Sequence, residues 1–505
     1  MRQALHIFKK DARQLRLEIA LALTVMAVFT FIAARRGFWL EDPDVNRGVG
    51  WMMAQVLLPL AWWILIARVV HAEAVPGDRQ FWITRPYAWK SLLGAKLLFI
   101  AAFVNLPLFV ADAIIIRVYG FSPAAEIAGL LWTQILFSAA FLLPVAALCA
   151  VTTGFVQLLS GTFILFVVVL AWNTAVPALT IGGTWGALDW ITVYSAILVA
   201  LLAASIILIW QYAKRETWAG RSIAGAAAIA MLAGGALIPW TSAFAIQSRL
   251  SKGRVDGASM HVAFDSDRKW LARAGVEGND GRVEIELPLR IIGMPADMEA
   301  KALGLVLAIE SPDGAVWHAP GRPWMQVSSE RELLSLRANV DGAVYRRVKD
   351  RPVKLRGTLY FALYGNRRTT RIPFGSRSVP APGLGLCSAS RSTHGGKQGD
   401  SYFLLCSSAF RSQADLISVH FVGLGKNGFR QVSPYEVRRR FSYSPFPADL
   451  DLSPVSQYIT FTTSPGELSD AVIDSLEPLA HVRRDFELDG LRLGEFEVHP
   501  TASPR

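Results

Sequence analysis

The 62 consecutive residues from Ile127 to Leu188 carry no charged side chain. A helix needs about 20 apolar residues to cross the hydrocarbon core of a bilayer, so this stretch alone is long enough for two membrane spans. The first 248 residues hold 17 Lys/Arg and 11 Asp/Glu, whereas the rest hold 34 and 29. The sequence therefore predicts a transmembrane domain, residues 17–248, followed by a water-exposed domain. This division excludes an ordinary soluble enzyme and a disordered chain.

Seven spans are predicted from the charge-poor runs. They are Ile19–Ala34, Gly48–Ala67, Leu97–Ile116, two within Ile127–Leu188, Trp190–Ala213 and Ser222–Ser248. With a cytoplasmic N-terminus, the inner segments carry 13 basic residues and the outer loops carry 4, which follows the positive-inside rule. An odd number of spans then places the C-terminal domain outside the cytoplasm of a bacterial inner membrane. If the number of spans differs by one from seven, the C-terminal domain lies in the cytoplasm instead.

The first 16 residues have the pattern of an amphipathic helix. Leu5, Phe8, Ala12 and Leu15 share one face, and the opposite face is basic, with Arg2, Lys9, Arg13 and Arg16. Such a helix lies in the membrane interface, with its apolar side in the acyl boundary and its cations at anionic headgroups. The alternative is that these cations only retain the first span in its orientation.

Residues 71–96 join the second predicted span to the third and combine aromatic side chains with cations. Pro76-Gly77 and Arg85-Pro86 interrupt any regular structure there. The aromatic residues Phe81, Trp82, Tyr87 and Trp89 offer an apolar surface that a protein partner could contact. The alternative is that these rings rest on the membrane surface.

This arrangement resembles the permease subunit of type-2 ATP-binding cassette (ABC) transporters, over roughly residues 1–215. That class has an in-plane N-terminal helix, six spans and an elbow after the second span. The resemblance rests on an acid, a glycine, a proline with a basic neighbour, and lysines that lead into the third span. These residues are Glu73, Gly77, Arg85, Pro86, Lys90 and Lys96.

The resemblance implies alternating access driven by a separate ATPase, within a permease homodimer or heterodimer. The ATPase-coupling elbow that it implies comprises Glu73, Gly77, Phe81, Trp82, Arg85, Pro86, Trp89, Lys90 and Lys96. The chain has no phosphate-binding loop of its own, because Gly395-Gly396-Lys397 lacks the leading glycine and the hydroxyl residue. ATP hydrolysis is therefore expected on a partner chain.

Asp112 is the acid placed well inside a predicted span. An intramembrane carboxylate costs about 2.5–3.5 kcal/mol on insertion scales, which makes it a candidate for the transport pathway. The alternative is that Asp112 reaches the interface or meets Arg117. Asn105, Pro107 and Pro144 are further candidates to kink helices and line a cavity.

The C-terminal half alternates apolar and polar residues with the period of a β-strand. The clearest strands are Val283–Ile291, Leu303–Ile309, Val353–Leu363 and Ile417–Phe421, with turn signals between them. The sequence predicts an all-β, sandwich-like domain in two units, residues 249–380 and 386–505, joined by a linker at Pro380–Gly385. Short helices are expected at Glu330–Ala338 and Glu467–Leu476.

Cys387 and Cys406 lie in the half that is predicted to be outside, where disulfides persist. The residues between them read as a loop that joins two strands, and facing positions on neighbouring strands bring cysteines within bonding reach. A disulfide is therefore predicted, and two reduced buried cysteines are the alternative. Cys149 is expected to stay free in the fourth span.

No catalytic or cofactor-binding motif is found in the sequence. Its histidines are scattered singly, which predicts no metal site, and the run Arg438–Arg440 has no aromatic ladder for nucleic acid. The leading hypothesis is a transport permease that contacts the lipid bilayer, an ABC-type ATPase and a second permease. The alternative is a membrane-anchored extracytoplasmic binding or sensing protein.

Overall fold

The fold is described from a computed structural model of the whole chain. The described residues are 2–35, 53–73, 88–164, 166–167, 183–184, 190–251, 259–265, 281–295, 297–319, 321–323, 326–328, 333–376, 378–392, 400–410, 416–425, 428–432, 452–464 and 466–496.

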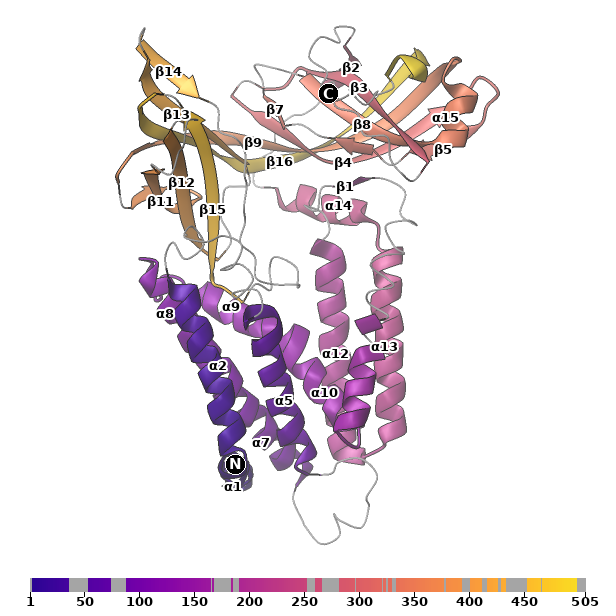
Figure 1. Cartoon of the computed structure of the whole chain (residues 1–505). Coiled ribbons are helices and arrows are strands. Elements are labelled where there is room, and N and C mark those ends of the chain that lie inside the picture. The colour runs from indigo at the N-terminus through magenta and orange to yellow at the C-terminus, as the bar shows by residue number, and fades with distance from the viewer. Residues whose placement is uncertain are drawn as a thin grey trace, which may run out of the picture.

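Helices make up the first half and form a bundle, with β-sheets stacked at one end of it (Figure 1). The helix α1 lies at the opposite end of the bundle, and the two ends are called the α1 end and the sheet end below. The helical elements are α1 (Arg2–Gln14), α2 (Arg16–Ala34), η1 (Met53–Leu57), α5 (Leu58–His71), α7 (Trp89–Ile100), η2 (Ala101–Asn105), α8 (Leu106–Val118), α9 (Ile127–Phe137), η3 (Ser138–Leu142), α10 (Leu143–Val151), α12 (Trp190–Lys214), α13 (Thr217–Leu237) and α14 (Trp240–Leu250).

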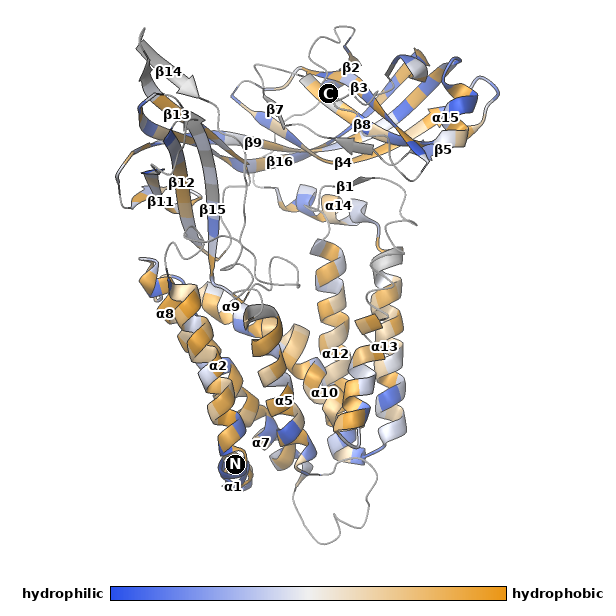
Figure 2. Ribbon diagram, in the orientation of Figure 1, coloured by the Kyte–Doolittle hydropathy of each residue, from blue (hydrophilic) through white to orange (hydrophobic). Residues whose placement is uncertain are grey.

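Four helices among the described residues are long and apolar enough to cross a membrane, which corrects the prediction of seven spans. They are Arg16–Ala34, Trp89–Val118, Ile127–Val151 and Trp190–Lys214. Figure 2 shows them hydrophobic over most of their length. In the part of the charge-free stretch that the structure describes, residues 127–164, 166–167 and 183–184, one of these helices is followed by a helical segment of ten residues, Phe155–Ile164. The last predicted span is divided, because Pro239 separates α13 from α14.

The N-terminal helix α1 packs one face against the bundle, with Ile7, Asp11 and Leu15 buried along it. Phe8 and Ala12, two residues of the predicted apolar face, pack beside this face on the helical core. Leu5 is an exception, because its side chain is largely exposed. The helix ends at Gln14, and α2 begins two residues later.

The second half is β-rich, and the strands belong to three antiparallel sheets. The elements are β1 (Gly183–Thr184), β2 (His261–Phe264), β3 (Arg282–Ile292), β4 (Glu299–Glu310), β5 (Val316–Ala319), β6 (Gly321–Pro323), β7 (Gln326–Ser328), β8 (Leu333–Asp341), α15 (Gly342–Val348), β9 (Pro352–Pro373), β10 (Val379–Ala381), β11 (Gly385–Ser392), β12 (Asp400–Ala409), β13 (Leu416–Gly425), β14 (Gly428–Val432), β15 (Val455–Ser464), β16 (Leu468–Arg492) and the 3₁₀ turn η6 (Leu493–Phe496). The strands predicted from alternation are present as β3, β4, β9 and β13.

The two longest strands, β9 and β16, belong to both sandwich-like units. One half of their sheet packs on β2, β3 and β8, and the other half packs on β10, β11 and β12. The C-terminal strand β16 thus completes the first unit as well as the second. The predicted division into residues 249–380 and 386–505 is therefore wrong, because one pair of strands crosses it.

Three local predictions in this half are also wrong. The expected linker Pro380–Gly385 forms a tight hairpin, in which Val379–Ala381 of β10 pairs with Gly385–Cys387 of β11. The expected helices at Glu330–Ala338 and Glu467–Leu476 fall on the strands β8 and β16. In β8 the buried residues alternate along the strand, and they are Leu334, Leu336, Ala338 and Val340.

Among the described residues, the sheets pack on the bundle on two sides, and β1, which precedes α12 in the sequence, also pairs with β4. Below the shared sheet, α14 packs Phe244 and Trp240 against Tyr360 of β9. On the other side, Phe410, Leu452 and Val455, next to the ends of β12 and β15, pack on the helical core. There Gln457 Nε2 donates to Tyr119 Oη at 3.1 Å, beyond the end of α8.

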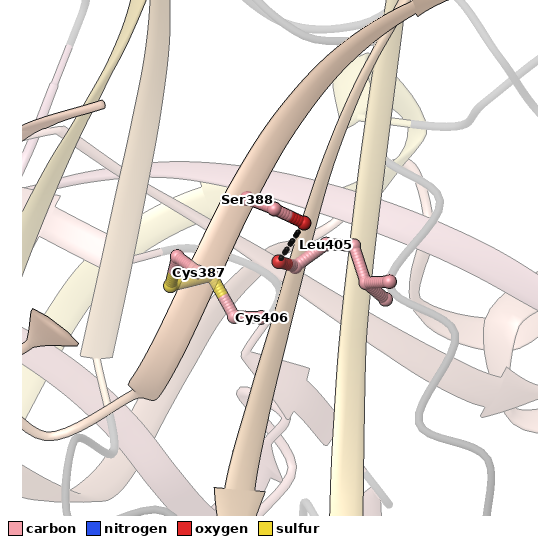
Figure 3. Close-up of a disulfide and its surroundings, with 4 residues drawn as sticks. All are labelled: Cys387, Ser388, Leu405 and Cys406. Atoms are coloured by element: carbon pink, nitrogen blue, oxygen red, sulfur yellow. Dashed lines mark hydrogen bonds between the residues drawn. A yellow bond between two sulfur atoms is a disulfide. The ribbon is translucent and has the colours of Figure 1, made fainter. Parts of the chain in front are cut away.

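The structure joins Cys387 and Cys406 in a disulfide, as the sequence predicts (Figure 3). The two residues face each other in the antiparallel register of β11 and β12, with their Cα atoms 4.0 Å apart. Beside them the Ser388 hydroxyl donates to the Leu405 carbonyl at 3.5 Å. Cys149 is a free, buried thiol in α10.

Candidate functional site: an ion cluster at the α1 end

Four charged side chains from three parts of the chain meet at the α1 end of the bundle. Lys10 and Asp11 come from α1, Glu73 follows the end of α5, and Lys96 lies in α7. We call these four residues the ion cluster. Asp11 occupies the apolar stripe of α1, between Ile7 and Leu15, so the packing of that helix carries its carboxylate into the bundle.

Lys96 is the centre of the ion cluster. Its Nζ atom lies 2.7 Å from Asp11 Oδ2 and 3.3 Å from Glu73 Oε2, and its side chain is only 2% exposed. Lys10 Nζ donates to Glu73 Oε1 at 2.8 Å and lies 3.8 Å from Asp11 Oδ1. Two ammonium groups therefore balance two carboxylates, and Lys10 connects the group to solvent, since a third of its side chain is exposed.

Electrostatics favours the charged form of Glu73. Burial by itself would raise the pKa of this carboxyl, but the ammonium groups of Lys96 and Lys10 outweigh it and hold the pKa below its usual 4.5. Removing buried ions from water costs several kcal/mol each, and only close opposite charges repay that cost. The cluster is consequently stable only when its parts from α1, α5 and α7 are together.

The ion cluster adjoins the start of the segment 74–87, and a hydrogen bond to α1 adjoins its other end. Glu73 is the residue directly before this segment, and Ala88, directly after it, donates its N–H to Gln3 Oε1 of α1 at 3.4 Å. From there α7 leads to Lys96, two turns further on. The helix α1 thus contacts the chain on each side of the segment.

Four of the nine residues predicted for the elbow lie among the described residues. Glu73 and Lys96 meet in the ion cluster, and Trp89 and Lys90 begin α7, with Lys90 Nζ 5.5 Å from the Trp89 ring centre. The others lie outside the described residues, and they are Gly77, Phe81, Trp82, Arg85 and Pro86.

Sequence reasoning missed Lys10 and Asp11. A signal was present, because Asp11 lies four residues from both Ile7 and Leu15, on the apolar face of the N-terminal helix. An acid at such a position needs a buried cation, and Lys96 supplies it.

Two further side chains hold helices together near the ion cluster. His71, at the end of α5, places Nε2 3.0 Å from the Cys149 carbonyl and 3.1 Å from Thr152 Oγ1. Arg221 of α13 donates to the Val151 carbonyl at 3.1 Å. The His71 contact adds to the bonds that Thr152 makes with the Cys149 carbonyl, and Arg221 supplies a partner for the Val151 carbonyl at the C-terminus of α10.

Asp112, which the sequence offers as a candidate for the transport pathway, is buried in α8 and is 1% exposed. Gln134 of α9 lies across from it, with Nε2 3.5 Å from Asp112 Oδ2.

No cluster of three or more His, Cys, Asp or Glu side chains with metal-binding geometry occurs among the described residues. None of the protein-family models matches this chain, and no curated protein matches it.

Proposed function

We propose that the chain is the permease subunit of an ABC transporter, in which a separate ATPase acts on the α1 end. The observation that carries this proposal is the ion cluster, which ties α1 and α7 to Glu73, at the end of α5 and the start of segment 74–87. The four apolar helices supply the membrane-crossing part.

The ion cluster gives the segment a mechanical role in this proposal. A force on residues 74–87 reaches Glu73 on one side and Ala88 on the other, and both sides are held by α1. The cluster prevents the segment from sliding independently, since separating Lys96 from Asp11 and Glu73 leaves buried charges without partners. The force then moves α5 and α7 as a unit and changes access to the substrate pathway.

The sheets lie at the end of the bundle away from α1 (Figure 1). With the ATPase at the α1 end in the cytoplasm, the β-rich half and its disulfide are extracytoplasmic in our proposal. This placement agrees with the oxidising conditions that disulfides require.

Purification of the full-length chain with its ATPase tests the proposal. We expect an ATP-hydrolysing subunit to co-purify with the wild type. The recovery of this subunit with R85A/W89A should be at least about tenfold lower, because the double substitution removes a hot-spot contact. The control is W218A/K214A, which removes an exposed Trp and a Lys where α12 and α13 meet. All three proteins should insert into membranes equally.

Two results would contradict the assignment. One is the absence of any ATP-hydrolysing partner from membranes that contain the wild-type chain. The other is equal recovery of that partner with R85A/W89A and with the control.

A further inference from the structure

Two neighbouring helices change to a π-helical turn immediately before a proline. In the first, the Leu106 N–H donates to the Ala101 carbonyl, five residues back, and Pro107 follows. In the second, the Leu143 N–H donates to the Ser138 carbonyl, and Pro144 follows. A proline has no N–H and crowds the carbonyl four residues before it, so the wide turn relieves the clash that a regular helix would have.

The two wide turns face each other and are linked by polar side chains. Asn105 Nδ2, at the end of η2, donates to Ser138 Oγ, at the start of η3, at 2.8 Å. The same nitrogen donates to Gln134 Oε1 at 3.2 Å, and Gln134 reaches Asp112. The irregular turns of adjacent helices are thereby held in register.

The parts of the helices on each side of these turns have different neighbours. Toward the α1 end, α7 packs on α1 and α12, and α10 packs on α5 and α12. Toward the sheet end, α8 packs on α2. Tyr119, directly after α8, donates to the Ala33 carbonyl of α2 at 3.3 Å and accepts from Gln457 of β15.

We propose that the hairpin α7–η2–α8 and α9–η3–α10 is a hinge that bends at its two facing π turns, with the Asn105–Ser138 hydrogen bond as its latch. Bending moves α8, α9 and the attached corner of β12 and β15 relative to α12. The segments α7 and α10 stay with α12. This hinge is a property of the chain alone and does not depend on the proposed ATPase.

The expected size of the motion determines which measurement can detect it. Helix kinks at prolines and π-bulges exceed about 20°. Ile114 lies nine residues beyond Asn105, or about 13 Å along the helix, so a 20° change in bend displaces it by roughly 4 Å. Pulsed electron spin resonance of paired nitroxide labels resolves a displacement of that size.

The test uses the full-length chain in lipid nanodiscs without nucleotide, in a Cys149→Ala background that retains the disulfide. One label pair, Ile114→Cys with Leu198→Cys, joins α8 to the sheet-end part of α12. The reference pair, Leu98→Cys with Ile209→Cys, joins α7 to the part of α12 nearer the α1 end. All four side chains are exposed on the bundle surface, so labelling them leaves the core intact.

We expect the Ile114–Leu198 distances to spread over roughly 4 Å more than the Leu98–Ile209 distances, for the bend derived above. Asn105→Leu removes the latch at similar volume and should widen the first distribution while the second is unchanged. Gln211→Leu, at a buried glutamine of α12 that hydrogen-bonds to Thr217, is the control and should widen neither.

Equal widths for the two wild-type pairs would overturn the hinge, and this comparison needs no core substitution. An unchanged Ile114–Leu198 distribution in Asn105→Leu, with the reference pair at its wild-type distance, would overturn the role of Asn105 as latch. An equal widening in Gln211→Leu would also count against it, because the effect would then be general loosening of the bundle.

Discussion

At the scale of single residues, burial has opposite consequences for a charge according to what surrounds it. Lys96 is as deeply buried as the apolar core, and two carboxylates lie within 3.3 Å of its ammonium group. Arg68 and Glu18 also form a pair of opposite charges, at 3.3 Å, but the side chains of this pair are 59% and 28% exposed. An exposed pair contributes little, whereas removal of one buried partner leaves the other uncompensated.

Lys96→Met tests this contrast in the purified full-length protein. We expect it to lower the free energy of unfolding by about 3–5 kcal/mol, because Asp11 and Glu73 remain buried with only Lys10 beside them. The matched control, Arg68→Met, should cost less than about 1 kcal/mol. Thermal unfolding in detergent measures both, and similar losses for the two variants would show that the ion cluster is not a special source of stability.

At the scale of elements, the alternation of polar and apolar residues located the strands β3, β4, β9 and β13. The strand β3 is the clear case, with Ile285, Leu287, Leu289 and Ile291 buried. The prediction failed at β8, whose Leu, Arg and Ala residues favour a helix locally. Pairing with β3 overrides that preference, since it buries the alternating apolar side chains of β8.

The strands β9 and β16 approach each other closely at Gly357 and Phe486. At Gly357 an added Cβ would overlap the ring of Phe486, which lies opposite it and is itself buried. Gly357→Ala should therefore lower the free energy of unfolding by about 1–3 kcal/mol through overpacking. Gly466→Ala is the control, because no atom lies within 4 Å of its added Cβ. Limited proteolysis of the full-length protein, over a denaturant series, measures both, and an equal response would refute the close packing.

At the scale of the whole molecule, the sequence predicted the composition of each half better than its connections. Charge separated a helical half from a β-rich half, but it could not show that β16 returns to pair along β9. That pairing depends on contacts between residues 97 to 140 positions apart, for which local patterns carry no signal. The elbow resemblance selected Glu73 and Lys96, and the packing of α1 against α7 shows that Asp11 supplies the second carboxylate beside Lys96.

The final prediction is the membrane topology, for which the ends of the bundle give a firmer basis than a count of spans. The helix α2 is 19 residues long, or about 28 Å, close to the 30 Å thickness of a hydrocarbon core. Since α1 and the sheets lie at opposite ends (Figure 1), they should lie on opposite sides of the membrane. In a Cys149→Ala background, an impermeant maleimide should label Ala343→Cys, exposed in α15, in cells whose inner membrane is intact. Lys9→Cys, exposed in α1, should react only after that membrane is permeabilised. Labelling of both positions under the same condition would reject this topology, and the reverse order would place the sheets and their disulfide in the cytoplasm.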